Sequence, residues 1–295
     1  MNNFLFNSSK WLDLIEEMHE SKIEFLNVNN SKVPFLNHED FISKRAISLP
    51  NSDFTIFLDE REKLQISDLS NKNQKILKII SNQKIELKYF HILKDKYYYL
   101  SFESYDEFIK NCNKNFKRNL KKNSQIYQTQ DLDTFYDFYF TSRIKNFNRI
   151  PYPKKYFYLL KKYFKDHLII YKNFQDNELL SITIFLEFEK NIYYIAAATN
   201  KNKKKPCSHK PFSEIVKYAE SRGIKTIMLG RGADMFKESL GAKYYHYSQI
   251  SIKKDNYFVE FKKVLAEYLI SIYLKFFLKY GIGKSIYEKI YKLCK

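Results

Sequence analysis

Glycine is scarce in this chain and is confined to its C-terminal part. The 295 residues include six glycines, and the first of them is Gly223. Phosphate-binding P-loops and dinucleotide-binding GxGxxG turns need closely spaced glycines, and neither pattern occurs anywhere in the sequence. The sequence therefore disfavours protein kinases, P-loop NTPases and Rossmann-type dinucleotide enzymes.

Cysteines and long apolar runs are also sparse. Cys112, Cys207 and Cys294 lack CxxC spacing, which is typical of a reducing compartment and disfavours a structural zinc site. The first ten residues lack the basic and apolar regions of a signal peptide, and no run of about 18 uncharged apolar residues occurs. We expect a cytoplasmic protein with no metal site and no permanently bound cofactor.

Acidic residues are outnumbered by basic ones. Lys and Arg total 51 against 33 Asp and Glu, which gives a formal net charge of +18 and a pI of about 9.4. This excess suggests an anionic partner such as a nucleic acid, a phosphate-rich cosubstrate or an acidic membrane surface. The alternative is a solvated lysine surface of the kind that an AT-rich genome encodes. Hydrophobic residues make up 44% of the chain, enough for a sizeable core.

The first third of the chain predicts one helix followed by short strands. The helix covers 8–22, where Trp11, Leu14, Ile15 and Met18 share a face. The expected strands are 23–28, 46–49, 54–58, 85–93 and 97–102, with a short helix at 76–80. The polar tripeptide at 94–96 predicts a hairpin turn between the last two strands.

From residue 104 onward the pattern predicts helices and then a sheet. Helices are expected at 104–122, 132–148 and 154–165, and strands at 167–174, 179–188 and 192–198, with tight turns at 175–177 and 189–191. A helix at 211–222, stopped by Gly223, leads to a strand at 224–229, a short helix at 234–240 and a strand at 243–252. An antiparallel meander followed by a right-handed βαβ crossover predicts an α+β layered fold, with 224–229 parallel to 192–198.

Two motifs carry a resemblance to a known family. The first runs from Ile227 to Lys243, IMLGRGADMFKESLGAK, with a Phe236-Lys237 pair before Leu240-Gly241. The second is the basic segment 115–122, NFKRNLKK. In this order and at this separation they resemble the GNAT acyltransferases of the FemAB and CelD type, over about 105–252. The resemblance implies a GNAT-like acyltransferase domain at 104–255, a degenerate GNAT-like half at 1–103 and a basic amphipathic helical tail at 256–295.

The chemistry of acyl transfer to an amine selects candidate residues. The donor's phosphates need cations and free N–H groups, which the loop before the 211–222 helix and the start of that helix can supply. The donor-binding candidates are Lys204, Lys205, Ser208 and Lys210, and the alternative is a solvated lysine loop. By resemblance, Lys237 contacts the transferring group. Deprotonation of the amine has several candidates, Asp234 and His209 first, with Glu214 and His246 in the same region and water-mediated loss of the proton as an alternative.

Arginines and aromatic residues are the candidates for the acceptor side. Arg231, between two glycines, can pair with a phosphate or carboxylate through its fork geometry. Arg118 and Arg143 are candidates for the phosphates of a nucleotide sugar or lipid-linked sugar, Tyr152 for stacking on a sugar and Phe236 for lining the acceptor site. A capped basic helix and an aromatic core are the alternatives for these residues.

Three functions remain open at this point. The first is an N-acyltransferase that uses acyl-CoA, such as acetyl-CoA, on an amine such as an amino sugar of cell-envelope polysaccharide. The second uses aminoacyl-tRNA, as FemAB-type enzymes do, on a peptidoglycan precursor. The third is an inactive adaptor at the inner face of the membrane, held there by the basic tail 256–295.

Overall fold

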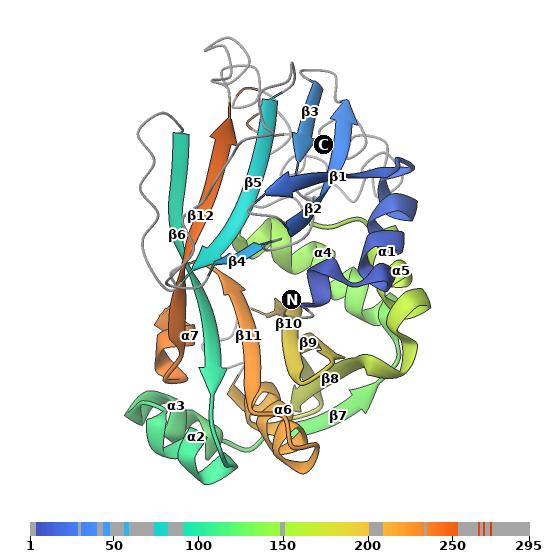
Figure 1. Cartoon of the computed structure of the whole chain (residues 1–295). Coiled ribbons are helices and arrows are strands. Elements are labelled where there is room, and N and C mark those ends of the chain that lie inside the picture. The colour runs from blue at the N-terminus through green and yellow to red at the C-terminus, as the bar shows by residue number, and fades with distance from the viewer. Residues whose placement is uncertain are drawn as a thin grey trace. The chain divides into compact units, whose positions relative to one another are not determined.

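A computed structural model describes residues 4–28, 31–39, 44–47, 56–58, 74–81, 91–147, 151–200, 209–232 and 235–252, together with 265, 268 and 272. The fold divides into two compact units (Figure 1). Unit 1 comprises 1–95, 148–156 and 246–295, and unit 2 comprises 96–147 and 157–245. The predicted boundaries at 103/104 and 255/256 stay predictions.

Unit 1 combines one capped helix with a mixed sheet. Helix α1 (Ser9–His19) follows the short 3-10 helix η1 (Leu5–Asn7) and is capped by Ser8, whose side chain accepts from the Trp11 amide at 3.3 Å. The strands of unit 1 are β1 (Ile23–Val28), β2 (Ser31–Glu39), β3 (Lys44–Ile47), β4 (Ile56–Leu58), β5 (Gln74–Ser81) and the end of β12 (Lys243–Ile252). They are ordered β1-β2-β3-β5-β12, and β4 also pairs with β5.

Unit 2 is built on a sheet in the order β6-β11-β10-β9-β8-β7. The strands are β6 (His91–Ser101), β7 (Gln125–Thr129), β8 (Leu168–Gln175), β9 (Glu178–Phe188), β10 (Asn191–Thr199) and β11 (Thr226–Arg231). Strands β7 to β10 are antiparallel neighbours, whereas β10 and β11 are parallel and joined by α6 (His209–Ser221). The predicted meander and βαβ crossover are therefore confirmed.

Helices cover both faces of this sheet. Besides α6, unit 2 contains α2 (Tyr105–Asn111), α3 (Lys114–Leu120), α4 (Leu132–Phe147), most of α5 (Lys154–Phe164), the 3-10 helix η2 (Lys165–His167) and α7 (Met235–Ser239). Helices α2, α3 and α6 share one hydrophobic cluster with alternate residues of the strands, including Ile169, Tyr171 and Phe185. Helix α4 contacts β9 and β10, and its rings pack on Phe157 of α5. The intervening strand residues, such as Ile170 and Ile184, are buried but lie outside the α6 cluster.

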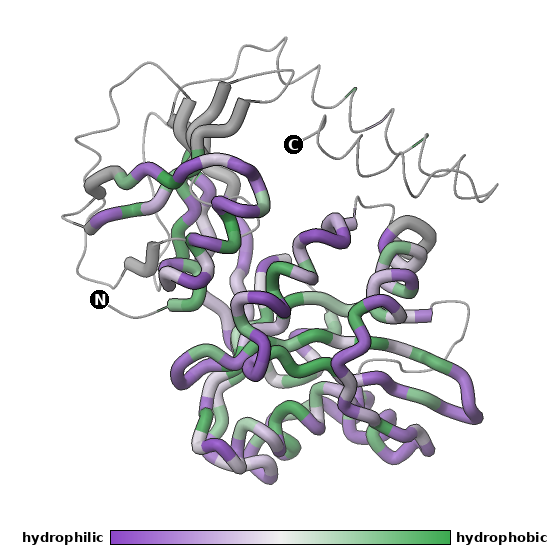
Figure 2. The backbone as a smooth tube through the Cα atoms, turned by 90° about the vertical axis from the view of Figure 1, so that its right-hand side faces the viewer, coloured by the Kyte–Doolittle hydropathy of each residue, from purple (hydrophilic) through white to green (hydrophobic). Residues whose placement is uncertain are grey.

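The hydropathy of the chain follows this layering. Strand β9 is buried along nearly its whole length, as expected for a strand with helices on both faces. In Figure 2 hydrophobic residues (green) run through the strands of unit 2, hydrophilic residues (purple) gather in its outer turns, and its helices carry both. Among the described residues, no helix is long and apolar enough to span a bilayer.

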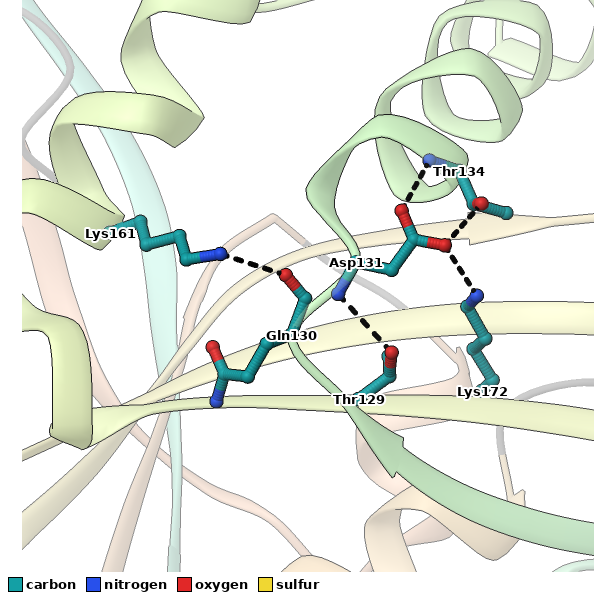
Figure 3. A network of polar contacts seen from close by, with 6 residues as sticks. All are labelled: Thr129, Gln130, Asp131, Thr134, Lys161 and Lys172. Atoms are coloured by element: carbon teal, nitrogen blue, oxygen red, sulfur yellow. Dashed lines mark hydrogen bonds and ion pairs between the residues drawn. The ribbon is translucent and has the colours of Figure 1, made fainter.

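Polar contacts fix the start of helix α4. Asp131 caps α4 by accepting from the Thr134 amide at 3.0 Å and hydroxyl, and it pairs with Lys172 of β8 at 2.9 Å (Figure 3). These hydrogen bonds, that from the Thr134 side chain first, hold the pKa of Asp131 far below its usual range. Lys161 of α5 donates to the Gln130 carbonyl at 3.1 Å. The start of α4 is thereby tied to a strand and to a second helix.

A buried carboxylate joins α6 to the sheet. Glu187 of β9 accepts from the Tyr218 hydroxyl at 2.5 Å and from the Arg222 guanidinium at 3.2 Å. Burial, with the neighbouring Glu187, raises the pKa of Tyr218 to about 12. This contact fixes the C-terminal half of α6 against the strands. Because α6 is a rigid helix, the contact also fixes the direction in which its N-terminal end points.

Most predicted elements are confirmed, and three predictions are wrong. The helix predicted at 76–80 is strand β5, whose Ile76, Ile79 and Ile80 pair with strands on both sides. The hairpin turn predicted at 94–96 is absent, because β6 runs unbroken from His91 to Ser101. The single helix predicted at 104–122 is two, because Asn113 caps a second helix by accepting from the Phe116 amide at 2.8 Å. Strands β2 and β7 were not predicted. The helical tail is described only at residues 265, 268 and 272, which are helical and exposed.

Candidate active site

Strands β10 and β11 are paired only over their first residues. Their parallel register covers Asn191–Thr226, Ile192–Ile227 and Tyr193–Met228. Just beyond these pairs each strand has an irregularity: β10 shifts register against β9 between Tyr194 and Ala196, and β11 shifts against β6 between Met228 and Gly230. In the described sheet β10 then continues to Thr199 alongside β9, and β11 continues to Arg231 alongside β6. The two parallel strands therefore part at the edge where their carboxyl ends lie.

The start of α6 and the short helix α7 meet at this edge. Tyr194 of β10 packs on Phe212 of α6 with ring centroids 5.3 Å apart, and Phe212 packs on Phe236 of α7 at 5.3 Å. The edge of one ring in the His209–Phe236 pair meets the face of the other, at 5.4 Å and 87°. A continuous aromatic contact thus joins the parted strand, the first turn of α6 and the predicted Phe-Lys pair.

His209 lies between three helices. It is the first residue of α6, and its ring also packs on Phe116 of α3 at 5.0 Å. Its Nε2 lies 3.2 Å from the side-chain amide nitrogen of Asn119. Burial, and to a lesser extent the positive charge of Lys122, lowers the pKa of His209 to about 4. Because a general base works best with a pKa near the operating pH, this lowered pKa, together with the contact to Asn119, favours a hydrogen-bonding role over proton abstraction.

Lys237 is turned inward beneath the end of β11. Its side chain is 8% exposed, and Nζ donates to the carbonyls of Gly230 at 3.1 Å and Arg231 at 2.6 Å. The ammonium also lies 5.5 Å from the centre of the Tyr98 ring, whose hydroxyl donates to Glu238 at 2.9 Å. The positive charge is therefore fixed at the carboxyl end of β11 and holds the turn that carries Arg231.

Two close contacts of the backbone fix α7 in place. Gly232, with a φ of 95°, donates its amide to the Lys96 carbonyl at 3.1 Å. At the other end of α7, Gly241 has a φ of 74°, and a Cβ built there would lie 2.8 Å from the carbonyl oxygen of Asn111. Only glycine combines this φ with so close an approach to a neighbouring backbone. The α2–α3 junction thus determines where Phe236 and Lys237 point.

The remaining donor-side candidates are only partly described. Lys210 follows His209, and its Nζ donates to the Ser124 carbonyl at 2.9 Å. That contact ties the start of α6 to the segment between α3 and β7. Lys204, Lys205 and Ser208 and the candidate base Asp234 lie outside the described residues. Their assignments stay predictions.

The acceptor-side candidates are not all in one place. Phe236 and Arg231 belong to the site just described, and Arg118 is exposed on α3, the helix that contacts His209. Arg143 lies on α4, the helix that packs on the other face of the sheet, 5.8 Å from the Tyr139 ring. Tyr152 belongs to unit 1, where its ring packs on Tyr156 at 4.8 Å.

Two residues of the site were not predicted from the sequence. Asn119 and Phe116 contact His209 although they are about 90 residues away in the chain. Both belong to the basic segment that carries the family resemblance, but they are uncharged and were not among the candidate site residues. Nothing in their spacing indicates a partner in α6.

Comparisons with known proteins support the fold. No family model matches the sequence, and no curated protein matches it. The crystal structure of FemX aligns with a TM-score of 0.54 at 10% identity, covering 84% of this chain and 92% of that chain. L-PGS from Bacillus licheniformis aligns with a TM-score of 0.51 at 10% identity, covering 90% and 96%. The C-terminal domain (DUF2156) of a putative lysylphosphatidylglycerol synthetase from Agrobacterium fabrum gives 0.50 at 8% identity, covering 84% and 88%.

At such identities a structural match shows the fold alone. The chain shares the mixed α+β fold of these proteins, with the antiparallel meander and the βαβ crossover that the resemblance implied. The narrower assignment to the FemAB and CelD type stays a prediction.

Proposed function

We propose that unit 2 transfers an acyl group from an activated donor to an amine. The observation that carries this proposal is the parting of β10 from β11 at the place where the first turn of α6 and the Phe236-Lys237 pair meet. A parted pair of strands offers main-chain hydrogen-bonding groups to an extended donor. The adjoining helix start and fixed lysine offer positive potential to its anionic parts.

The reaction needs few groups from the protein. The amine nitrogen attacks the acyl carbonyl carbon, the bond from that carbon to the donor's sulfur or oxygen breaks, and the amine loses a proton. Positioned donors and charges stabilise the oxygen that becomes negative in the transition state. We assign this electrostatic role to Lys237, whose charge is fixed at the end of β11. Arg231 is the proposed anchor for a phosphate or carboxylate, Phe236 lines the acceptor site, and Asp234 is the proposed proton acceptor.

Our first candidate donor is acyl-CoA, with acetyl-CoA as the simplest case. Under this proposal Lys204, Lys205, Ser208 and Lys210 bind its phosphates at the start of α6. The acceptor is an amine such as an amino sugar of cell-envelope polysaccharide, which Arg118 helps to bind. This acceptor follows from the family resemblance. The acceptor-side roles of Arg143 and Tyr152 stay predictions.

The second candidate donor is aminoacyl-tRNA, with a peptidoglycan precursor as acceptor. Two observations favour it: FemX and L-PGS align over most of this chain, and segment 110–122 has six basic residues and no acid. Helix α3 of that segment contacts His209, so its exposed basic side chains adjoin the proposed site. Phosphate contacts of this kind predict affinity that falls steeply with salt.

Donor binding and turnover decide between these candidates. In the first assay, purified protein is mixed with acetyl-CoA and a panel of amino sugars, and release of the thiol is followed. In the second, binding of aminoacyl-tRNA is measured at salt concentrations from about 50 to about 200 mM. Thiol release that depends on the amine supports the first donor, and aminoacyl transfer supports the second. Neither activity, together with binding to anionic liposomes, would instead support the inactive adaptor.

The role of Lys237 is tested against a matched lysine. Lys237→Ala removes the charge beneath the end of β11, and Lys225→Ala removes an exposed lysine just before the same strand, paired with Glu103. We expect a loss of about a hundredfold in kcat for the first variant and little change for the second, as for removal of one oxyanion-stabilising group. Melting temperatures control for unfolding of the buried variant. Full turnover by a folded Lys237→Ala protein would remove this assignment.

A further inference from the structure

The junction of α3, α6 and α7 holds one imidazole in a fixed orientation. The ring of His209 is packed between Phe116 of α3 and Phe236 of α7, with centroid distances of 5.0 Å and 5.4 Å. The two ring nitrogens have different surroundings. Nε2 faces Asn119 of α3, and Nδ1 is buried. A ring held by two aromatic contacts and a hydrogen bond cannot turn without disturbing two helices.

The direction of the hydrogen bond between Asn119 and His209 determines which ring nitrogen of His209 carries the proton. A side-chain amide nitrogen only donates, so Nε2 of His209 accepts from Asn119 at 3.2 Å. A neutral imidazole carries one N–H, which is then on Nδ1. Among the described residues Nδ1 has no hydrogen-bond partner. Leaving a buried N–H unpaired costs about 1–3 kcal/mol, so an unpaired donor in this position calls for an explanation.

Burial and one nearby charge keep His209 neutral. Lys122, just after α3, lies close enough to oppose protonation. The ammonium of Lys210 in α6 is held by the Ser124 carbonyl, and that of Lys237 in α7 by two carbonyls of β11. Burial, and to a lesser extent the charge of Lys122, lowers the pKa of His209 to about 4, so it stays an uncharged donor across the physiological range.

We propose that Asn119 is a positioning residue that holds the proton of His209 on Nδ1, and that this Nδ1–H binds an oxygen of the donor substrate. The inference rests on the proposed acyl transfer and assigns His209 to donor binding, with no part in proton abstraction. The oxygen is a hydrogen-bond acceptor that belongs either to the acyl carbonyl or to a phosphate. Both sources satisfy the buried N–H in the same way.

Two substitutions of His209 separate its two nitrogens. Asparagine places an amide nitrogen near the position of Nδ1, and glutamine places one near that of Nε2. The proposal predicts that His209→Asn keeps most of kcat/KM, whereas His209→Gln loses about tenfold or more, the effect of one missing hydrogen bond to the reacting ligand. A role limited to bracing α3 against α6 predicts the reverse order, and that order would overturn the proposal.

The source of the oxygen follows from two probes. Coenzyme A carries phosphates without an acyl group, and a short acetyl thioester without phosphates carries only the carbonyl. Weaker binding of coenzyme A to His209→Gln, with unchanged turnover of the short thioester, indicates a phosphate. Slower turnover of both acetyl-CoA and the short thioester, with unchanged binding of coenzyme A, indicates the carbonyl. No change in either measurement contradicts a donor-binding role.

The tautomer can be measured without any activity. Nitrogen-15 NMR of the six histidines, with His209 assigned from its variants, is expected to show the proton on Nδ1 in the wild type. Asn119→Asp keeps the contact but replaces the donor with an acceptor, so the proton is expected to move to Nε2 and the pKa to rise. A wild-type proton on Nε2 would overturn the inference even in an active enzyme. Absence of transfer with every donor would instead defeat the proposed function and leave the tautomer result intact.

Discussion

Replacing Gly241 by alanine tests whether the α2–α3 junction sets the position of α7. Gly241 ends α7 with a φ of 74°, and its added Cβ would lie 2.8 Å from the Asn111 carbonyl oxygen and 3.1 Å from the carbonyl carbon. Gly223 ends α6 with a φ of 66°, and a Cβ there would meet nothing within 4 Å. The two glycines share a backbone conformation and a place at a helix end, so they differ mainly in the space around them.

The expected cost follows from these two environments. A non-glycine residue in the left-handed region costs about 1–2 kcal/mol, a penalty that both variants incur. Gly241→Ala must in addition move the backbone of Asn111, and overpacking of this kind costs about 1–3 kcal/mol. We therefore expect Gly241→Ala to lower the free energy of unfolding by about 2–5 kcal/mol and Gly223→Ala by about 1–2 kcal/mol.

Thermal melts of both variants measure the difference directly. Each kcal/mol corresponds to about 2–4 °C in a domain of this size, so Gly241→Ala should melt several degrees below Gly223→Ala. A shift of α7 also displaces Phe236 and Lys237, so transferase activity should fall more in the Gly241 variant at temperatures where both are folded. Equal melting temperatures would show that the close approach to Asn111 does not constrain α7.

Three further substitutions or reactions test the packing of unit 2. Asp131→Ala should cost about 1 kcal/mol at pH 7, and Asp131→Asn, which can still cap α4, should lose only the ion pair with Lys172. Because the hydrogen bonds from Thr134 depress the pKa of Asp131, its contribution is complete above about pH 5 and is lost only as the pH falls toward the depressed folded-state pKa. The difference in melting temperature from the alanine variant should therefore be smaller at pH 3 than at pH 7, without vanishing. Burial raises the pKa of the Cys112 thiol to about 12, so iodoacetamide at pH 8 should alkylate it at least about a hundredfold more slowly in the native protein than in urea, as read by peptide mass spectrometry. Glu187→Gln keeps the size of the buried side chain but weakens both hydrogen bonds it accepts, and denaturant unfolding should show a loss of about 1–3 kcal/mol.

Local signals located the elements of unit 2 well. The period-2 runs gave β8, β9 and β10, and the turn between β8 and β9 is formed by Asp176 and Asn177, both at positive φ as a tight hairpin requires. Gly223 marked the end of α6, and the strand after it lies parallel to β10. These features depend on the conformational preferences of neighbouring residues, which the sequence expresses directly.

The errors lie where distant segments decide the outcome. Residues 76–80 have the composition of either a short helix or a strand, and pairing with β3, β4 and β12 selects the strand. The polar residues 94–96 resemble a turn, yet β6 continues through them beside other strands. In both cases backbone hydrogen bonds to partners far along the chain outweigh a weak local preference.

The sequence by itself determined the order of helices and strands in unit 2, the motif at Phe236-Lys237 and the class of fold, because periodicity, caps and turn residues act over a few positions. Only the tertiary structure decided that β10 and β11 part after three residue pairs, that Lys237 turns inward, and that Asn119 meets His209. Those features arise when segments about 90 residues apart pack together, and no local pattern encodes the contacts that packing creates.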